Sequence, residues 1–446
     1  MDVIFTQDTL CAISSPAGVG GIAVARVSGA DAFALVDKVW HGQSLADAES
    51  HTAHLGWIVD PDSGERLDQG VATVFRAPAS FTGENVVEIG VHGSRWIQRE
   101  LISLLIRQGC RLAEAGEFTR RAFASGRMDL AEAEGVADVI ASSSRAAHRI
   151  AVTQMRGEFS RKLRGLHDSL LDLASLLELE LDFSEEDVEF ASRDKLRAIA
   201  SEISTEVTRL AASFAAGRAI KEGVPVAIVG ATNAGKSTLL NALLRDDKAI
   251  VSDVHGTTRD VVEDAVEIGG ILFRFIDTAG LRDTSDVVER MGIERAISRL
   301  ESSSIVLWVV DALDADGVEP SWQRVAPHIG QGQKIVALIN KSEALTEEQA
   351  HALSLRVAAA SSSTANVRIH FISAKTGSGI DELETTLTDM SGVASGTADE
   401  IMVTNHRHYE ALTNASASIV RVIDGLATDL PGDLIAQDVR ETLHHL

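Results

Sequence analysis

The side chains with the most specific chemistry lie in a glycine-rich turn that reads G-x-x-x-x-G-K-S. The β-branched run Val224–Gly230 precedes this turn, and the helix-prone run Ser237–Leu244 follows it. Between a strand and a helix, such glycines let main-chain amides approach an anion, which the helix N-terminus also attracts. Lys236 then reaches the outer phosphates, and the Ser237 hydroxyl binds Mg²⁺. The turn predicts a nucleoside triphosphate site made of Gly230, Asn233, Ala234, Gly235, Lys236, Ser237 and Thr238.

Two downstream motifs supply the groups that a phosphate-sensing switch needs. A threonine hydroxyl in Gly256–Asp260 completes the coordination of Mg²⁺ and senses the terminal phosphate. A strand over Ile271–Ile276 delivers Asp277, which polarises the water shell of the metal, and Gly280 offers an amide to the same phosphate. The nucleotide contacts expected here are Ser252, Asp253, Thr257, Thr258, Asp277, Thr278, Ala279 and Gly280, and the expected Mg²⁺ ligands are Ser237 and Thr258.

Two later loops predict the base. The strand Ile335–Ile339 ends in Asn-Lys-Ser-Glu, and the strand Val367–Ile372 ends in Ser-Ala-Lys. A carboxylate in the first loop pairs with the ring N–H and amine of guanine, and the second loop lies near its O6. The residues expected at the base are Asn340, Lys341, Glu343, Ser373, Ala374 and Lys375. Four motifs in this order predict a GTPase.

The composition bounds the class of protein. A chain of 446 residues predicts about three domains, and a formal net charge of −24 disfavours general attraction to nucleic acid. RNA would then be bound through a local basic patch or beside a partner. Only Cys11 and Cys110 are present, which argues for a reducing compartment rather than a disulfide framework. Without a signal-peptide pattern or a membrane-length apolar run, we expect a cytoplasmic protein that has no membrane partner.

The patterning on either side of the nucleotide motifs predicts further domains. Short apolar strands alternate with glycine turns before residue 120, which is typical of an α+β domain. Apolar residues at helical spacing occur both before and after the nucleotide domain, so we expect that domain to be inserted into a helical bundle. The predicted boundaries are 1–120 for the α+β domain, 121–217 and 383–446 for the helical domain, and 218–382 for the nucleotide domain.

Two N-terminal segments carry unusual charge. Phe81–Glu84 ends in a carboxylate just before a strand, and Gly116–Phe123 contains Arg120 and Arg121, with Arg127 after it. Because charged residues are mostly exposed, the residue types alone favour a surface carboxylate and a solvated helix face.

Taken together, these motifs resemble the MnmE (TrmE) family of tRNA modification GTPases over essentially the whole chain. Phe81–Glu84, Gly116–Phe123 and Gly292–Ala296 support the resemblance together with the nucleotide motifs. It implies a multidomain α+β and α/β fold: an N-terminal folate-binding-like domain that dimerises, a helical bundle, and an inserted Ras-like P-loop GTPase domain.

The resemblance also implies a reaction. With a flavoprotein partner of the MnmG (GidA) type, which carries the FAD, the family adds a carboxymethylaminomethyl-type group at C5 of the wobble uridine (position 34) of certain tRNAs. A tetrahydrofolate derivative, 5-formyl- or 5,10-methylene-, supplies the one-carbon unit, and Arg26, Glu84 and Arg127 fall at folate-contacting positions. The implied assembly is a homodimer that binds GTP or GDP and forms a heterotetramer with the partner.

The hydrolytic machinery departs from that of many small GTPases. Leu281 occupies the position where those proteins place a water-orienting glutamine, and an apolar side chain cannot do this. Asp283, Asp286 and Glu289 are the carboxylates available nearby, and the residues alone do not choose among them. The resemblance points to Glu289, acting through a bridging water. It also implies a K⁺ ion between the β- and γ-phosphates in place of an arginine finger, held by Asn233, Ser252, Val254 and Thr257.

Two departures from the family pattern leave alternatives open. Glu343 stands where the family has its guanine-reading aspartate, and the extra methylene either weakens guanine selectivity or is offset by a shift of the loop. The C-terminal Cys-x-Gly-Lys tail is absent before Leu446, so we expect either a truncated chain or a GTPase that modifies tRNA poorly. The rival functions are a ribosome-assembly or other RNA-associated GTPase, and a nucleotide-gated folate-binding scaffold without modification activity.

Overall fold

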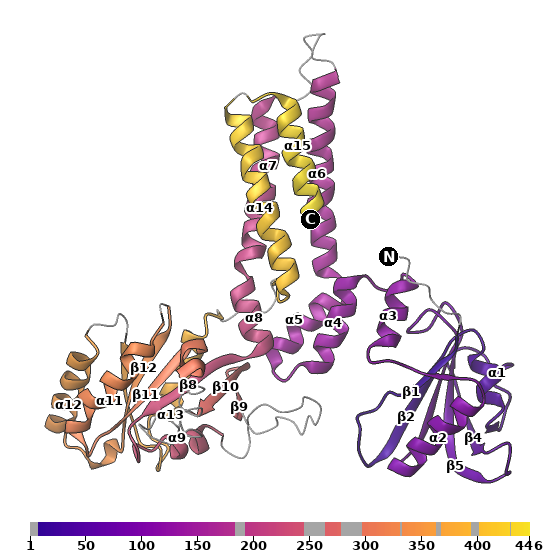
Figure 1. The fold of residues 1–446 in the computed structure, drawn as a ribbon, viewed down its shortest axis with the longest axis horizontal. Coiled ribbons are helices and arrows are strands. Elements are labelled where there is room, and N and C mark those ends of the chain that lie inside the picture. Colours follow the sequence, from indigo (N-terminus) through magenta and orange to yellow (C-terminus); the bar gives the residue numbers. More distant parts are fainter. Residues whose placement is uncertain are drawn as a thin grey trace, which may run out of the picture. The chain divides into compact units, whose positions relative to one another are not determined.

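The computed structural model describes residues 8–182, 192–244, 264–277, 297–330, 332–362, 367–393, 401–428 and 430–446. The chain divides into two compact units, Met1–Ala137 and Asp138–Leu446 (Figure 1). Residues 121–137 therefore belong to the same unit as the N-terminal sheet. No helix within the described ranges is both long enough and apolar enough to cross a membrane.

The N-terminal unit is built on a seven-stranded sheet in the order β3-β4-β5-β6-β2-β1-β7. Neighbouring strands are antiparallel except for β1 and β7, which are parallel. The strands are β1 (Leu10–Ile13), β2 (Gly20–Ser28), β3 (Trp40–His41), β4 (Thr52–Val59), β5 (Arg66–Phe75), β6 (Val86–Gly93) and β7 (Arg111–Leu112). The helices are α1 (Ala32–Asp37), α2 (Arg95–Arg107), α3 (Glu117–Ala124) and α4 (Leu130–Ala141), the last of which crosses the division between the units. The predicted α+β architecture is confirmed.

One face of this sheet is buried and the other is largely exposed. Ala25 and Val27 of β2 alternate inward and pack in one core with Leu101 and Leu105 of α2. The intervening positions lie on the opposite face, which carries several exposed apolar side chains, namely Ile22 (75% exposed), Leu55 (65%) and Val71 (42%). The sheet therefore has one core face and one apolar face that the described helices leave open.

The second unit contains a helical bundle that is assembled from two distant parts of the chain. Its helices are α5 (Arg145–Met155), α6 (Glu158–Asp182), α7 (Arg193–Ala212), α8 (Phe214–Glu222), α14 (His406–Ala427) and α15 (Gly432–His445). Figure 1 shows α6 and α7 running alongside α14 and α15. The buried hydroxyl of Thr442 on α15 donates a hydrogen bond to that of Ser418 on α14 (2.9 Å).

The two ends of the inserted segment are held together within the bundle. The main-chain N–H of Val403, just before α14, donates to the hydroxyl of Ser213, between α7 and α8 (3.0 Å). The chain therefore leaves the bundle and returns to it at neighbouring points, as an inserted domain requires.

The inserted nucleotide domain is a six-stranded sheet in the order β13-β12-β11-β8-β10-β9. Its strands are β8 (Val224–Gly230), β9 (Asp264–Ile268), β10 (Ile271–Asp277), β11 (Ile305–Asp311), β12 (Lys334–Asn340) and β13 (Val367–Ile372). All neighbours are parallel except β9 and β10. Its helices are α9 (Lys236–Leu243), α11 (Val318–Val325), α12 (Glu347–Ala360) and α13 (Ile380–Met390).

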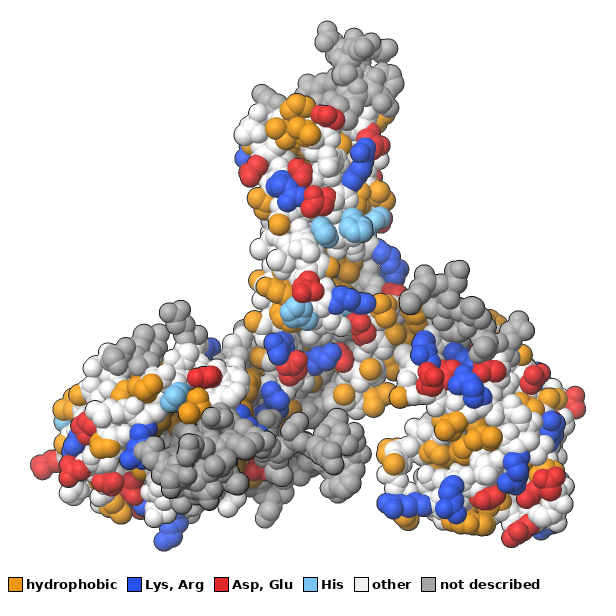
Figure 2. Space-filling view, in the orientation of Figure 1, with side chains coloured by type: hydrophobic (Ala, Val, Ile, Leu, Met, Phe, Trp, Pro, Cys, Tyr) orange, Lys and Arg blue, Asp and Glu red, His pale blue; other side chains and the backbone are white. Residues whose placement is uncertain are grey.

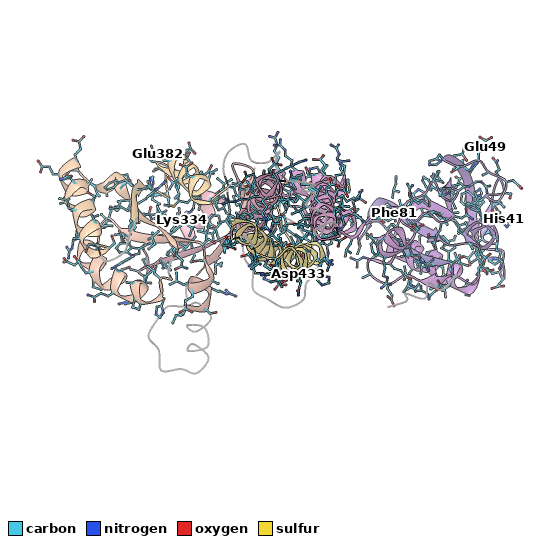
Figure 3. The ribbon with its side chains drawn as sticks, turned by 90° about the horizontal axis from the view of Figure 1, so that it is seen from above. His41, Glu49, Phe81, Lys334, Glu382 and Asp433 are labelled. Carbon is cyan, nitrogen blue, oxygen red and sulfur yellow. The ribbon has the colours of Figure 1, made fainter. Side chains whose placement is uncertain are left out.

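This parallel sheet brings the predicted motifs to one edge. The carboxyl ends of parallel strands point the same way, so β8, β10, β12 and β13 all end at this edge, as in other α/β proteins. Lys334 starts β12 at the opposite edge, where its ammonium donates to the main-chain oxygen of Met390 at the end of α13 (2.7 Å; Lys334 is labelled in Figure 3). The prediction that the inserted domain has a Ras-like fold is confirmed.

A pair of adjacent leucines in α6 provides a test of how the core of the bundle is packed. Leu170 is fully buried, whereas its neighbour Leu171 is 45% exposed. We expect Leu170→Ala to lower the free energy of unfolding of the bundle by about 2–5 kcal/mol, because it leaves a cavity. Leu171→Ala, the matched control, should cost no more than about 0.5 kcal/mol. Urea unfolding followed by circular dichroism measures both, and equal costs would contradict this packing.

Candidate functional site

The phosphate-binding loop connects β8 to α9 and depends on a glycine at its end. Gly235 has a φ of 97°, a left-handed conformation that disfavours any side chain. A Cβ at this position would lie 2.1 Å from the side-chain nitrogen of Asn340. Glycine is therefore required here both for the backbone angle and for the close approach of a neighbouring loop.

Asn340 joins three loops at the sheet edge. Its side-chain nitrogen donates to the main-chain oxygen of Ala234 in the phosphate loop (2.8 Å), and its side-chain oxygen accepts from the N–H of Ala374 after β13 (2.9 Å). Asn340 is 3% exposed, so water does not compete for these bonds. Lys236 lies over the same loop, where its ammonium donates to the main-chain oxygens of Gly230 (3.0 Å) and Ala231 (2.8 Å).

The two predicted base-binding loops also contact each other. The ammonium of Lys341 pairs with Asp311 at the end of β11 (2.6 Å). A hydrogen bond from the side chain of Ser373 holds the pKa of the exposed Glu343 carboxyl below its usual value, and Lys375 and Lys341 act in the same direction. The ionised form of Glu343 is therefore favoured by groups of the Ser-Ala-Lys loop.

The structure places some of the predicted nucleotide contacts and leaves others undescribed. Ser237 and Thr238 lie in the first turn of α9, and Asn233 has a φ of 63° in the exposed part of the loop. Asp277 ends β10, directly beside Ile228 of β8. Outside the described residues lie Ser252, Asp253, Val254, Thr257, Thr258, Thr278, Ala279, Gly280, Leu281, Asp283, Asp286 and Glu289. Their assignments stay predictions.

In the N-terminal unit, the loop Phe81–Glu84 brings together the three residues that the family resemblance had singled out. The Arg26 guanidinium lies over the rings of Phe81 (5.0 Å) and Phe118 (5.3 Å), and it pairs with Glu88 (2.7 Å). Gly83 of the same loop lies against Arg127, because a Cβ built on Gly83 would be 3.2 Å from Cγ of Arg127. Arg26 and Arg127 therefore both adjoin the loop that ends in Glu84. Phe81, the first residue of this loop, is labelled in Figure 3.

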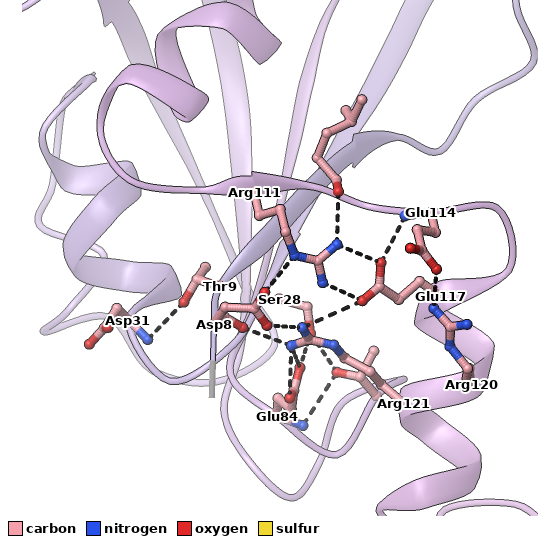
Figure 4. A network of polar contacts seen from close by, with 12 residues as sticks. Asp8, Thr9, Ser28, Asp31, Glu84, Arg111, Glu114, Glu117, Arg120 and Arg121 are labelled. Atoms are coloured by element: carbon pink, nitrogen blue, oxygen red, sulfur yellow. Dashed lines mark hydrogen bonds and ion pairs between the residues drawn. The ribbon is translucent and has the colours of Figure 1, made fainter. Parts of the chain in front are cut away.

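Glu84 is part of a polar network that joins β2, this loop and α3 (Figure 4). Its carboxylate accepts hydrogen bonds from the hydroxyl of Ser28 (2.7 Å) and from one guanidinium nitrogen of Arg121 (3.1 and 3.2 Å). The expectation of a solvated arginine face is correct for Arg120, which is 52% exposed and pairs with Glu114. It is wrong for Arg121, whose side chain is 5% exposed, because carboxylates from other elements surround it.

Sequence reasoning missed the other members of this network. Asp8 accepts from both Arg111 and Arg121, and Glu117 is buried against Arg111. Hydrogen bonds from Arg111 lower the pKa of Glu117, which keeps this carboxyl ionised although it is buried. The available signal was the spacing of Glu117 and Arg121, which are one helical turn apart in α3.

Comparison with known proteins covers both units of the chain. Residues 9–127 match the family described as GTP-binding protein TrmE N-terminus, and residues 130–446 match the MnmE helical domain. The chain belongs to the MnmE family of tRNA modification GTPases. This MnmE family member is 49% identical over 446 residues to the tRNA modification GTPase MnmE of Parabacteroides distasonis, covering 99% of this chain and 95% of that one. It is 48% identical over 445 residues to the Bacteroides fragilis protein of the same name, covering 99% and 94%.

Among solved structures, the MnmE family member shares 27% identity with Aquifex aeolicus Era bound to GDP and AlF4⁻, covering 44% of this chain and 66% of that one. The TM-score of this match is 0.30.

Glu343 provides a test of base recognition. We expect Glu343→Gln to weaken GDP binding by about 10- to 100-fold, because an uncharged amide replaces the carboxylate that pairs with guanine. Glu343→Asp should retain most of the affinity, and Glu347→Gln, at an exposed position in the first turn of α12, should change nothing. Isothermal titration with GDP and with IDP, which lacks the guanine amine, measures the effect.

The lowered pKa of Glu343 predicts how GDP affinity depends on pH. A carboxyl whose pKa is lowered in the folded protein stays ionised at every pH above the usual glutamate pKa. Its contribution to GDP affinity is lost only as the pH falls through the lowered pKa. The ratio of GDP affinities between wild type and Glu343→Gln should therefore stay constant from pH 7 to about pH 5. A ratio that has already fallen by half at the usual glutamate pKa of about 4.3 would contradict the lowered pKa.

Proposed function

We propose that this protein hydrolyses GTP and, with a flavoprotein partner of the MnmG (GidA) type, adds a carboxymethylaminomethyl-type group at C5 of the wobble uridine of certain tRNAs. The observation that supports the proposal is the presence of two separate loops whose residues match the family pattern. A phosphate loop is fixed by Asn340, and a separate loop gathers Arg26, Glu84 and Arg127. Family membership supplies the reaction to which these two sites are assigned.

In the nucleotide domain, this chain's own residues bind and orient the phosphates. Lys236 and the amides of the phosphate loop pair with the phosphate oxygens, and Glu289 orients the attacking water. Hydroxyl and amide oxygens suit hard cations, and Ser237 and Asn233 offer such oxygens beside the loop. Mg²⁺ is assigned to Ser237 and Thr258, and K⁺ to Asn233, Ser252, Val254 and Thr257. When bound, these cations offset the negative charge that develops on the phosphates.

In the N-terminal unit, we assign a tetrahydrofolate derivative to the Phe81–Glu84 loop. Glu84 is held by two hydrogen-bond donors yet keeps 32% of its side chain exposed, so its carboxylate can accept ring N–H groups of a ligand. Arg26 is fixed by two aromatic rings and an ion pair, and it retains 22% exposure. Guanidinium groups bind the carboxylates that folates carry.

The assembly is proposed to be a homodimer that forms a heterotetramer with its partner, which carries the FAD. The open sheet face with Ile22, Leu55 and Val71 supports self-association, because contiguous exposed apolar area marks interaction sites. On the face visible in Figure 2, Lys and Arg side chains are interspersed with Asp and Glu. With a net charge of −24, this pattern favours tRNA binding together with the partner. The expected location is the cytoplasm.

Reconstitution tests the proposal. The full chain is incubated with tRNA, the flavoprotein, 5,10-methylene-tetrahydrofolate, glycine or ammonium, and GTP, and the modified nucleoside is quantified by mass spectrometry. We expect modification by wild type and a loss of about 100-fold or more in both hydrolysis and modification for Lys236→Ala. Lys195→Ala, at an exposed position of α7, is the matched control.

The outcomes separate the rival functions. Modification that survives in Lys236→Ala, despite lost hydrolysis, would support a folate-binding scaffold. GTP hydrolysis by a wild-type chain that never modifies tRNA would support another RNA-associated GTPase.

The K⁺ assignment has its own test. At equal ionic strength, GTP hydrolysis should be about 10- to 100-fold faster in K⁺ than in Na⁺, because the cation neutralises charge between the phosphates. Asn233→Gly retains the left-handed backbone at this position but removes the amide oxygen. It should reduce the rate in K⁺ to that in Na⁺. Equal turnover of wild type in the two salts would rule out this cation site.

A further inference from the structure

Arg121 reaches from α3 to the loop that carries Glu84 without being accessible itself. One terminal nitrogen of its guanidinium donates to the main-chain oxygen of Asp8 (2.9 Å) and to both carboxylate oxygens of Glu84 (3.1 and 3.2 Å). The other donates to the side chain of Asp8 (2.6 Å). Because 5% of the side chain is exposed, Arg121 is poorly placed to touch a ligand directly.

The buried Arg121 and the 40% exposed Arg111 share Asp8 and Glu117 as partners but differ at Glu84. Arg111 donates to Glu117 (3.1 Å) and to Asp8, so both of these carboxylates keep a cation if Arg121 is lost. Within the described part of the chain, Arg121 is the one cation at ion-pairing distance from Glu84. Removing Arg121 would therefore leave Glu84 as the carboxylate without a compensating charge (Figure 4).

Two hydroxyls fix the remaining side of Glu84. Ser28 donates to Glu84, so the hydrogen bond between Ser28 and Thr82 (2.7 Å) has Thr82 as its donor. Thr82 in turn accepts from the N–H of Glu84 (3.3 Å). Ser28 and Thr82 are fully buried. The carboxylate is thus held from two directions, and the rest of its acceptor capacity faces outward.

We infer that Arg121 is a positioning residue for ligand binding, which acts by holding the Glu84 carboxylate in one orientation and compensating its charge. The inference rests on the proposed function, since the ligand is the tetrahydrofolate derivative assigned to this loop. A planar guanidinium can hold Glu84 and Asp8 at once in a fixed direction, whereas a lysine ammonium is a single point charge on a flexible stem. The geometry therefore calls for arginine at this position.

The first experiment compares two adjacent arginines of the same helix in the full chain. Binding of 5-formyl-tetrahydrofolate is measured by isothermal titration. Arg121→Met should weaken binding by about 10- to 100-fold, since it leaves a partly buried carboxylate without its cation. Arg121→Lys should fall between Arg121→Met and wild type. Arg120→Met, which removes an exposed ion pair, should remain within about twofold of wild type.

A double-mutant cycle distinguishes positioning from general support of the fold. If Arg121 acts through Glu84, Arg121→Met should cost about tenfold less in a Glu84→Gln background than in wild type. An equal loss in both backgrounds would overturn the inference. If Arg121→Met fails to fold, Arg121→Lys and Ser28→Ala are each combined with Glu84→Gln instead. Ser28→Ala removes a hydrogen-bond donor to Glu84 but keeps the charges of Glu84 and Arg121. Ser28→Ala should weaken binding by about 3- to 10-fold in wild type and have little effect beside Glu84→Gln.

The controls separate this inference from the proposed function. If wild type binds the folate, Glu84→Gln weakens binding and both Arg121 variants bind like wild type, the inference fails and the folate site stands. If wild type binds no folate, the assigned site and the inference fall together. GTP hydrolysis should be unchanged in the Arg120, Arg121 and Ser28 variants, since none of these residues belongs to the nucleotide domain.

Discussion

The nucleotide site depends on one buried amide. Asn340 donates to the phosphate loop and accepts from the loop after β13, so a single side chain fixes the distance between the loop assigned to the phosphates and the loops assigned to the base. Both bonds are shielded from water, which makes them strong and makes their loss costly. The absence of a Cβ at Gly235 follows from the same contact, because Asn340 occupies the space.

In the N-terminal unit, charged side chains rather than an amide connect distant segments of the chain. Arg111 and Arg121 neutralise three carboxylates from separate segments, and the bonded hydroxyls of Ser28 and Thr82 complete the network. Arg121 and Glu117 are buried, and such ionised groups are tolerated when they are paired and hydrogen-bonded. In each unit, therefore, a polar contact between distant segments, rather than the apolar core alone, determines where the functional loop lies.

The elements and the order of the motifs could be predicted because their signals are local. Four strands of the nucleotide sheet end directly before a motif, so a run such as Val224–Gly230 defines both the strand and the place of the phosphate loop. The environments of Arg120 and Arg121 could not be predicted in this way. They are adjacent and identical in type, and what buries Arg121 is a pair of partners 113 and 37 residues away in the sequence. Long-range pairing of this kind leaves no periodic pattern, and charge alone favoured exposure for both.

The placement of the nucleotide domain between α8 and α14 has a consequence for biosynthesis. The ribosome releases α6 and α7 first, and their apolar faces have no α14 or α15 to pack against until the whole intervening domain has emerged. The N-terminal sheet and the nucleotide domain can each complete their cores from contiguous sequence, whereas the bundle needs helices that are synthesised after the nucleotide domain. The hydrogen bond from Val403 to Ser213 joins the two points at which the chain leaves and re-enters the bundle. A nascent chain of this protein therefore carries an unfinished helical surface until α14 and α15 emerge, which is a period of exposure to chaperones and to aggregation.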